Sequence, residues 1–153
     1  MKILDVIIVS ALPISELRGG IPLAVYYGFD IVHAYFVSVF GNFIPVPFLL
    51  LFLDYIREKI LKKWRFSHNL YLRIEKNVLE KRTLIDKYGY IGLTLFVAIP
   101  LPVTGAWTGC LLASLLKMDV KKSIIHITLG ILIAGLLVSM ALTGFISILN
   151  LRI

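Results

Sequence analysis

Long apolar stretches separated by short polar ones dominate this chain. Three of them contain no Asp, Glu, Lys or Arg, and they cover residues 31–53, 88–116 and 123–150. Each is long enough to cross a hydrocarbon layer of about 30 Å, which takes about 20 helical residues. A fourth apolar stretch, over residues 3–27, is interrupted by Asp5, Glu16 and Arg18. The pattern predicts helices embedded in a membrane.

The apolar pattern also repeats. Residues 3–53 match residues 92–142 without a gap, at a spacing of 89 positions. The matches include a Leu-Pro pair, two glycines and an aspartate: Leu12-Pro13 with Leu101-Pro102, Gly20 with Gly109, Asp30 with Asp119, and Gly41 with Gly130. A doubled hydrophobic segment that is broken by proline is typical of transporters whose two halves surround a site near the bilayer midplane. Transport is therefore the first functional hypothesis.

Residues 88–116 are predicted to enter the membrane and return. Pro100 and Pro102 cannot donate backbone hydrogen bonds and disfavour a helical residue before them, which predicts an unwound run over residues 98–104. A half-helix over residues 105–116, capped by Thr104, would cover about 18 Å, half of a bilayer. The segment is therefore predicted to be a re-entrant hairpin.

Residues 3–28 contain the same parts in the same order. An apolar arm ends at a break at Pro13, and Pro22 suits the first turn of a returning half-helix. Between them lies a polar tip, predicted to be unwound, that contains Glu16, Arg18, Gly19 and Gly20. This segment is predicted to be a second re-entrant hairpin.

Together these elements define a fold class. Each hairpin is followed by one predicted transmembrane helix, over residues 31–53 and 123–149. We expect an all-α polytopic membrane protein with a single membrane domain over residues 1–153. Its two halves are expected to form an inverted repeat of re-entrant helical hairpin plus transmembrane helix.

Charge predicts the orientation. Residues 54–87 contain ten of the sixteen Lys and Arg, with the apolar spacing of an amphipathic helix. Because basic loops remain on the cytoplasmic side, this segment and the cluster around Lys121 are both expected there, in a multi-pass protein of the cell membrane. The segment between the two clusters must then enter and return. The alternative, four ordinary spanning helices, would place Lys121 outside.

Composition excludes several classes of protein. Hydrophobic residues make up 59% of the chain and charged residues only 16%, against about a quarter in soluble domains. The net charge of +7 comes mainly from residues 54–87, so no nucleic-acid partner is expected. We find no catalytic triad, metal-ligand cluster or nucleotide-binding loop, and therefore expect no enzyme, cofactor or metal.

Glu16 and Arg18 are the leading candidate site residues. An ionisable side chain at membrane depth costs about 2.5 to 3.5 kcal/mol, so it usually faces a cavity or a partner. In an unwound tip, residues two apart point to the same side. Arg18 suits an anion, and Glu16 suits a proton because burial favours a protonated carboxyl group. The alternative is that the two charges neutralise each other and hold the tip together.

The remaining candidates lie around the predicted breaks. Gly19 and Gly20, between Pro13 and Pro22, permit a turn in the first tip. Thr104 and Trp107 follow Pro100 and Pro102 in the second hairpin, where packing remains an alternative role for each. Asn42 lies at a predicted helix kink marked by Gly41, Pro45 and Pro47, and would need an internal partner in lipid.

Two stretches of the sequence resemble a known family. The run from Ala11 to Pro22, ALPISELRGGIP, and the run from Pro100 to Trp107, PLPVTGAW, are similar to the small multidrug export protein family of bacteria and archaea. The resemblance covers nearly the whole chain, and the name of the family implies efflux.

The architecture also resembles the DedA, or SNARE-associated, membrane proteins. That resemblance implies a proton-coupled carrier or lipid translocase with facing hairpins, in which Glu16 and Arg18 match the working acid and base. The second hairpin departs from this pattern, because Gly105 and Trp107 stand at the repeat-related positions. A symmetric pair of proton sites is therefore not expected.

The functional hypothesis is a small carrier with alternating access. Its expected partners are the bilayer, protons, and an amphipathic or anionic solute or lipid headgroup. A homodimer is expected, because two crossings and two hairpins enclose little space. The alternative is a non-transporting scaffold or assembly factor.

Overall fold

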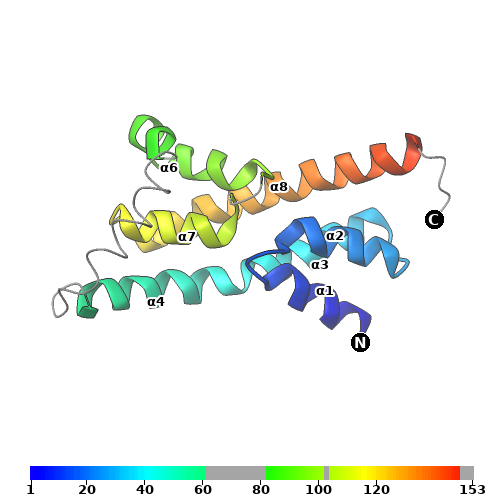
Figure 1. The fold of residues 1–153 in the computed structure, drawn as a ribbon, viewed down its shortest axis with the longest axis horizontal. Coiled ribbons are helices and arrows are strands. Elements are labelled where there is room, and N and C mark those ends of the chain that lie inside the picture. Colours follow the sequence, from blue (N-terminus) through cyan, green and yellow to red (C-terminus); the bar gives the residue numbers. More distant parts are fainter. Residues whose placement is uncertain (61–81, 102–103, 149–153) are drawn as a thin grey trace.

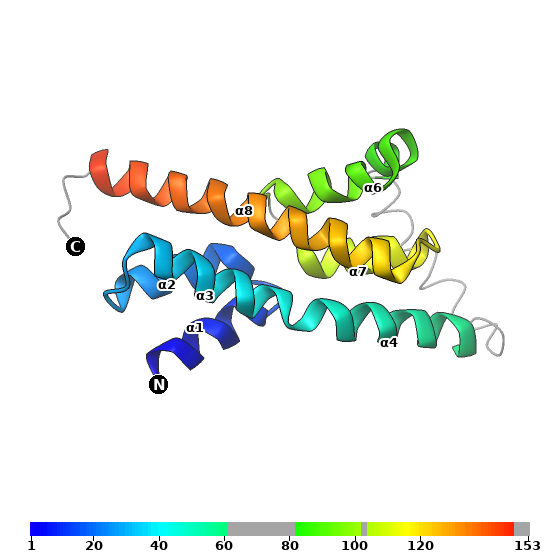
Figure 2. The same ribbon diagram turned by 180° about the vertical axis from the view of Figure 1, so that it is seen from behind.

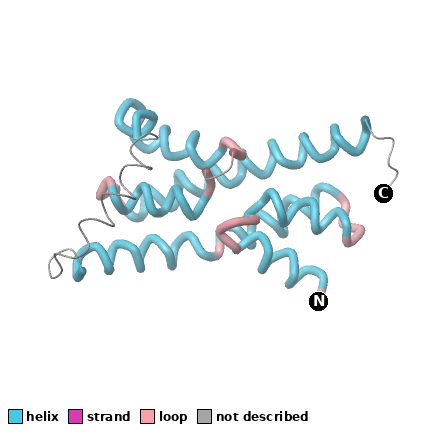
Figure 3. The backbone as a smooth tube through the Cα atoms, viewed as in Figure 1, coloured by secondary structure: helices cyan, strands magenta, loops and turns pink. Residues whose placement is uncertain are grey.

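The computed structural model describes residues 1–60, 82–101 and 104–148. Every helix or strand assigned within these ranges is an α-helix, which confirms the all-helical prediction (Figures 1 and 3). The helices are α1 (Lys2–Ala11), α2 (Glu16–Tyr26), α3 (Ile31–Phe43), α4 (Pro45–Ile60), α6 (Arg82–Ala98), α7 (Ala106–Leu115) and α8 (Val120–Ile148). Pro102 and most of the basic amphipathic segment lie outside the described residues.

Two helical stretches are long and apolar enough to cross a membrane. They are Ile31–Ile56, which joins α3 to α4, and α8. The 29 residues of α8 extend about 43 Å at 1.5 Å per residue. Only 33% and 17% of their most apolar windows are buried inside the protein, so most of these side chains point outward. An apolar exterior of this extent suits lipid and does not suit water.

The predicted kink is confirmed as the division between α3 and α4. The helix predicted over residues 31–53 continues to Ile60 but is interrupted at Ile44. Pro45 and Pro47 have no backbone N–H, so two hydrogen bonds of a regular helix cannot form there. Asn42, two residues before Ile44, is buried, but its Oδ1 atom lacks the expected internal partner among the described residues.

The helices form two groups along two long rods. In the first half (α1–α4), α1 and α2 pack against α3, and in the second half (α6–α8), α6 and α7 pack against α8. The rod formed by α3 and α4 runs opposite to α8 (Figures 1 and 2). The broken segments, α1–α2 and α6–α7, lie on opposite halves of the molecule and meet near its middle (Figure 1).

Glycines spaced 89 residues apart make equivalent helix contacts. A Cβ on Gly41 would lie 2.7 Å from the Ile7 carbonyl oxygen of α1, and one on Gly130 would lie 2.9 Å from the Thr94 carbonyl oxygen of α6. Each long helix therefore approaches the first arm of its broken segment at a distance that only glycine permits.

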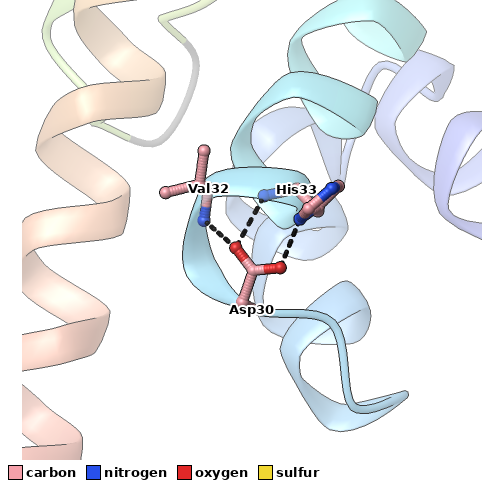
Figure 4. A network of polar contacts seen from close by, with 3 residues as sticks. All are labelled: Asp30, Val32 and His33. Carbon is pink, nitrogen blue, oxygen red and sulfur yellow. Dashed lines mark hydrogen bonds and ion pairs between the residues drawn. The ribbon is translucent and has the colours of Figure 1, made fainter.

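The repeated aspartates begin the two long helices. The Asp30 carboxylate accepts hydrogen bonds from the backbone N–H groups of Val32, at 3.1 Å, and His33, at 3.2 Å (Figure 4). It also pairs with the His33 ring, which holds the pKa of Asp30 below its usual value. Asp119 accepts from the Lys122 N–H at 2.9 Å at the start of α8. Both residues are N-caps, which explains their place in the repeat.

The first broken segment is unwound over fewer residues than predicted. α2 already begins at Glu16, so Gly19 and Gly20 are helical and Pro22 lies within the helix instead of in its first turn. Proline at this position removes only the helix bond to the Arg18 carbonyl group. The break itself is confirmed, but it is short and ends at Ser15, before the charged residues.

The second broken segment has its break where prolines predicted it. α6 ends at Ala98 and α7 begins at Ala106. The predicted cap is wrong, because Gly105 and not Thr104 is the N-cap of α7. Gly89, with φ of 56°, divides α6 close to the predicted start of the hairpin at residue 88.

Candidate functional site

Glu16 lies at the N-terminus of a helix from the other half of the chain. Its Oε1 atom accepts a hydrogen bond from the Trp107 backbone N–H at 3.4 Å, and the Ala106 N–H also bonds to the carboxyl group. These are the first two residues of α7. A carboxylate at this position satisfies free N–H groups and interacts favourably with the positive end of the helix dipole. Glu16 is only 7% exposed and therefore forms part of the interior.

Gly105 makes room for this carboxylate. A Cβ on Gly105 would lie 2.6 Å from the Glu16 carboxyl carbon, closer than non-bonded atoms approach. Gly105 also has φ of 149°, which glycine adopts readily and other residues do not. Glu16 itself has φ of 45°, a conformation uncommon outside glycine and one found at functional sites. Residues 16 and 105, which are spaced by the repeat interval, thus contact each other.

Arg18 also binds the second broken segment. Its guanidinium Nη2 donates a hydrogen bond to the Thr104 carbonyl oxygen. Among the described residues no ion pair joins Glu16 to Arg18, and the pair found there links His33 to Asp30. The two charged side chains therefore each bond to the second half, and the charge of Arg18 also acts on Glu16.

Trp107, in the second half, also bonds to the first half. Its indole Nε1 donates to the Ala11 carbonyl oxygen at 3.0 Å, at the end of α1. The Thr104 hydroxyl oxygen lies 2.6 Å from the Ile99 carbonyl oxygen and 2.8 Å from that of Leu101, so it can donate to either one inside its own loop. Trp107 thus links the halves, and Thr104 stabilises the unwound backbone.

A small cavity lies against these contacts. Its volume is about 10 Å³, which is room for one water molecule and far below the volume of a drug-sized ligand site. Its polar side chains, Glu16, Arg18 and Asn42, all come from the first half. The second half contributes only glycine and apolar residues, which are Val97, Pro100, Gly105, Ala106, Ile131, Ala134 and Val138. The described form is therefore closed to a large solute.

The other predicted site residues lie away from the cavity. Pro13 is exposed in the loop after α1, and Pro22 is half-buried within α2. Gly19 packs against the Ser15 side chain, and Gly20 is buried against Ser10 and Ser38. These four residues shape the first broken segment but do not line the cavity.

The sequence did not identify Gly105, Ile131 and the Ala11 carbonyl group as parts of the site. A signal existed for the first two, because they are the repeat partners of Glu16 and Asn42. Every residue has a backbone carbonyl group, so the sequence alone cannot identify the one at Ala11 as a binding partner.

Comparison with known proteins identifies the family. A family model described as "Putative small multi-drug export protein" matches residues 16–137. No curated protein and no solved structure matches the chain. The matched range begins at Glu16 and includes every residue that lines the cavity except Val138. Because the match covers well over half of the 153 residues, the chain belongs to this family of small export proteins.

Proposed function

We propose that this protein is a small membrane transporter that moves an amphipathic or anionic solute by alternating access, coupled to protons through Glu16. The family description supports a general role in export. In an open form of the site, Arg18 would bind the anionic group of a drug-like compound or of a lipid phosphate. No enzymatic step is part of the proposal.

The contact of Glu16 with the N-terminus of α7 carries this proposal. An ionised carboxylate is a better acceptor for the N–H groups of Ala106 and Trp107 than a protonated one, so protonation weakens these contacts. A charge in such a partly buried position is worth up to about 2 kcal/mol, which shifts an equilibrium between closed and open forms roughly 30-fold. Proton uptake by Glu16 would therefore loosen the contact between the halves.

The same geometry supports an inverted repeat. Residues 16 and 105 touch, and residues 42 and 131 line one cavity, each pair being 89 positions apart. The two halves of an inverted repeat are related by a two-fold axis. Equivalent positions of the halves contact each other only near that axis, so we place the axis at this cavity. The helices α1, α2 and α7, of 10 or 11 residues, extend about 15 Å each, which is half of a bilayer. This arrangement also supports the proposed likeness to the DedA proteins.

Flux in proteoliposomes tests the function. Purified protein should drive movement of fluorescent amphipathic dyes under an imposed pH gradient, together with proton movement reported by a luminal pH indicator. Protein-free vesicles and a protonophore are the controls. If wild-type protein moves neither an anionic nor a cationic dye nor a labelled lipid phosphate, the scaffold alternative is favoured.

Cysteine labelling tests the inverted topology. Val32 and Lys121 are exposed repeat partners near the starts of α3 and α8, and Cys110 is buried. In a Cys110→Ala background, Val32→Cys should react with an impermeant maleimide from outside the cell. Lys121→Cys should react only after permeabilisation, because the basic residues 54–87 and 117–122 are proposed to be cytoplasmic. Labelling of Lys121→Cys from outside would instead support four ordinary spans.

A further inference from the structure

Asn42 lines the cavity beside Glu16 and has a buried oxygen without a hydrogen-bond donor within the ranges that the structure describes. The residue is 1% exposed, and its Oδ1 atom has no hydrogen-bond donor among the described residues. It lines the same cavity as Glu16 and Arg18. A buried acceptor left unsatisfied costs about 1 to 3 kcal/mol. The cavity therefore suits a ligand that donates a hydrogen bond to Asn42.

Size and charge decide which ligand fits. A cavity of about 10 Å³ holds one water molecule and excludes any larger donor. The guanidinium group of Arg18 lines the same space and opposes a metal cation. A water molecule can donate one O–H to Asn42 and the other to the Glu16 carboxylate.

We propose that Asn42 holds a water molecule against Glu16, and that the carboxyl group exchanges its proton with this water. The role in coupling rests on the proposed function, whereas the binding of the water does not. The O–H proton of the water passes to the carboxylate while its oxygen takes up a proton from the aqueous side, so the water stays bound and no cation rests in the cavity. Arg18 and the Cys110 thiol are the ionisable groups that lie near Glu16. Asn42 is a positioning residue that acts through the water.

Two other buried polar groups of the first half lie outside the cavity lining. Ser10 and Ser38, like Asn42, have buried oxygens without a partner in the described part of the chain. Ser38 lies one helical turn before Asn42 on the same face of α3. The repeat partners of these three residues are all isoleucines: Ile99, Ile127 and Ile131. Of these pairs, only Asn42 and Ile131 line the cavity, where the first half supplies the polar side chain and the second half an apolar one.

Infrared difference spectroscopy of the protein in lipid vesicles tests this site. Titration with pH should reveal a carboxyl band that is absent in Glu16→Gln, and a bound-water O–H band that shifts in isotopically labelled water. Asn42→Leu should remove the water band and shift the carboxyl frequency. Asn42→Ser, which keeps a polar group and leaves room, should retain both bands.

Ser123→Ala provides the matched control. It also removes a fully buried polar group without a partner among the described residues, but Ser123 does not line the cavity. The water and carboxyl bands should persist in this variant. Circular dichroism of each variant checks the fold.

The outcome separates the water from the transport proposal. If Asn42→Leu keeps the water band and the carboxyl frequency of the wild type, the inference is wrong. If both change while wild-type vesicles show no flux, the water site stands and the transport function fails. If flux occurs and its pH profile is the same in Asn42→Leu and wild type, the role of Asn42 in coupling is excluded.

Discussion

Glu16→Gln is expected to abolish proton-coupled flux while leaving the protein folded. The amide keeps an oxygen that can accept from the Trp107 N–H, but it cannot gain or lose a proton or carry a charge. The free energy of the contact between residue 16 and α7 should then be independent of pH. We expect the pH-driven rate to fall about 100-fold or more, the usual scale for losing a proton-transferring group. Dye flux and luminal pH, measured together, check this result.

Asp5→Asn is the matched control for this substitution. It makes the same change from carboxyl to amide on α1, at a residue that does not line the cavity. Its flux should equal that of the wild type. Retention of pH-driven flux by Glu16→Gln would contradict the assignment of Glu16 as the proton carrier.

Gly105→Ala is expected to separate the two broken segments. The new methyl group would occupy the place of the Glu16 carboxyl group, and alanine would strain the backbone at φ of 149°. Displacement of a buried carboxylate from its N–H donors, with this strain, should cost about 2 kcal/mol or more. Thermal unfolding in detergent should show a lower midpoint, and flux should be lost.

Two further variants isolate the cause. Gly144→Ala changes a glycine of α8 whose added methyl group would meet nothing within 4 Å, so its midpoint should be unchanged or higher. Glu16→Ala in the Gly105→Ala background removes the overlap and should recover part of the stability, a coupling that a double-mutant cycle measures. An unfolding midpoint of Gly105→Ala equal to that of the wild type would contradict the described contact.

Local signals in the sequence predicted the elements well but not their ends. Pro45 and the prolines near Ala98 marked breaks correctly, because proline removes a hydrogen-bond donor wherever it stands. Pro22 was wrongly predicted to lie in the first turn of a helix. It lies inside α2, because a helix tolerates one lost hydrogen bond when it packs closely against neighbouring helices. The start of α2 coincides with a contact between Glu16 and the second half, and no local sequence pattern predicts that contact.

The site was predicted in part for a related reason. Burial of Glu16 and Asn42 follows from the cost of polar groups at membrane depth, which single residues reveal. Their partners follow from long-range geometry, since the donor to Glu16 lies 91 residues further along the chain. The repeat register contained a hint of that geometry. Gly105 was interpreted as a missing acid, whereas the structure shows it as the space that Glu16 occupies.

The meeting of residues 16 and 105 constrains how a duplicated gene can diverge. Positions far from the axis, such as Asp30 and Asp119, have equivalent surroundings, so one ancestral residue can serve in both copies. Near the proposed axis, positions face their own counterparts, and a side chain at position 105 would overlap the carboxyl group of Glu16. Here Glu16 differs from Gly105, and Asn42 differs from Ile131. With the proposed symmetry, divergence between the two copies at these positions is therefore what lets a single acidic group occupy the centre.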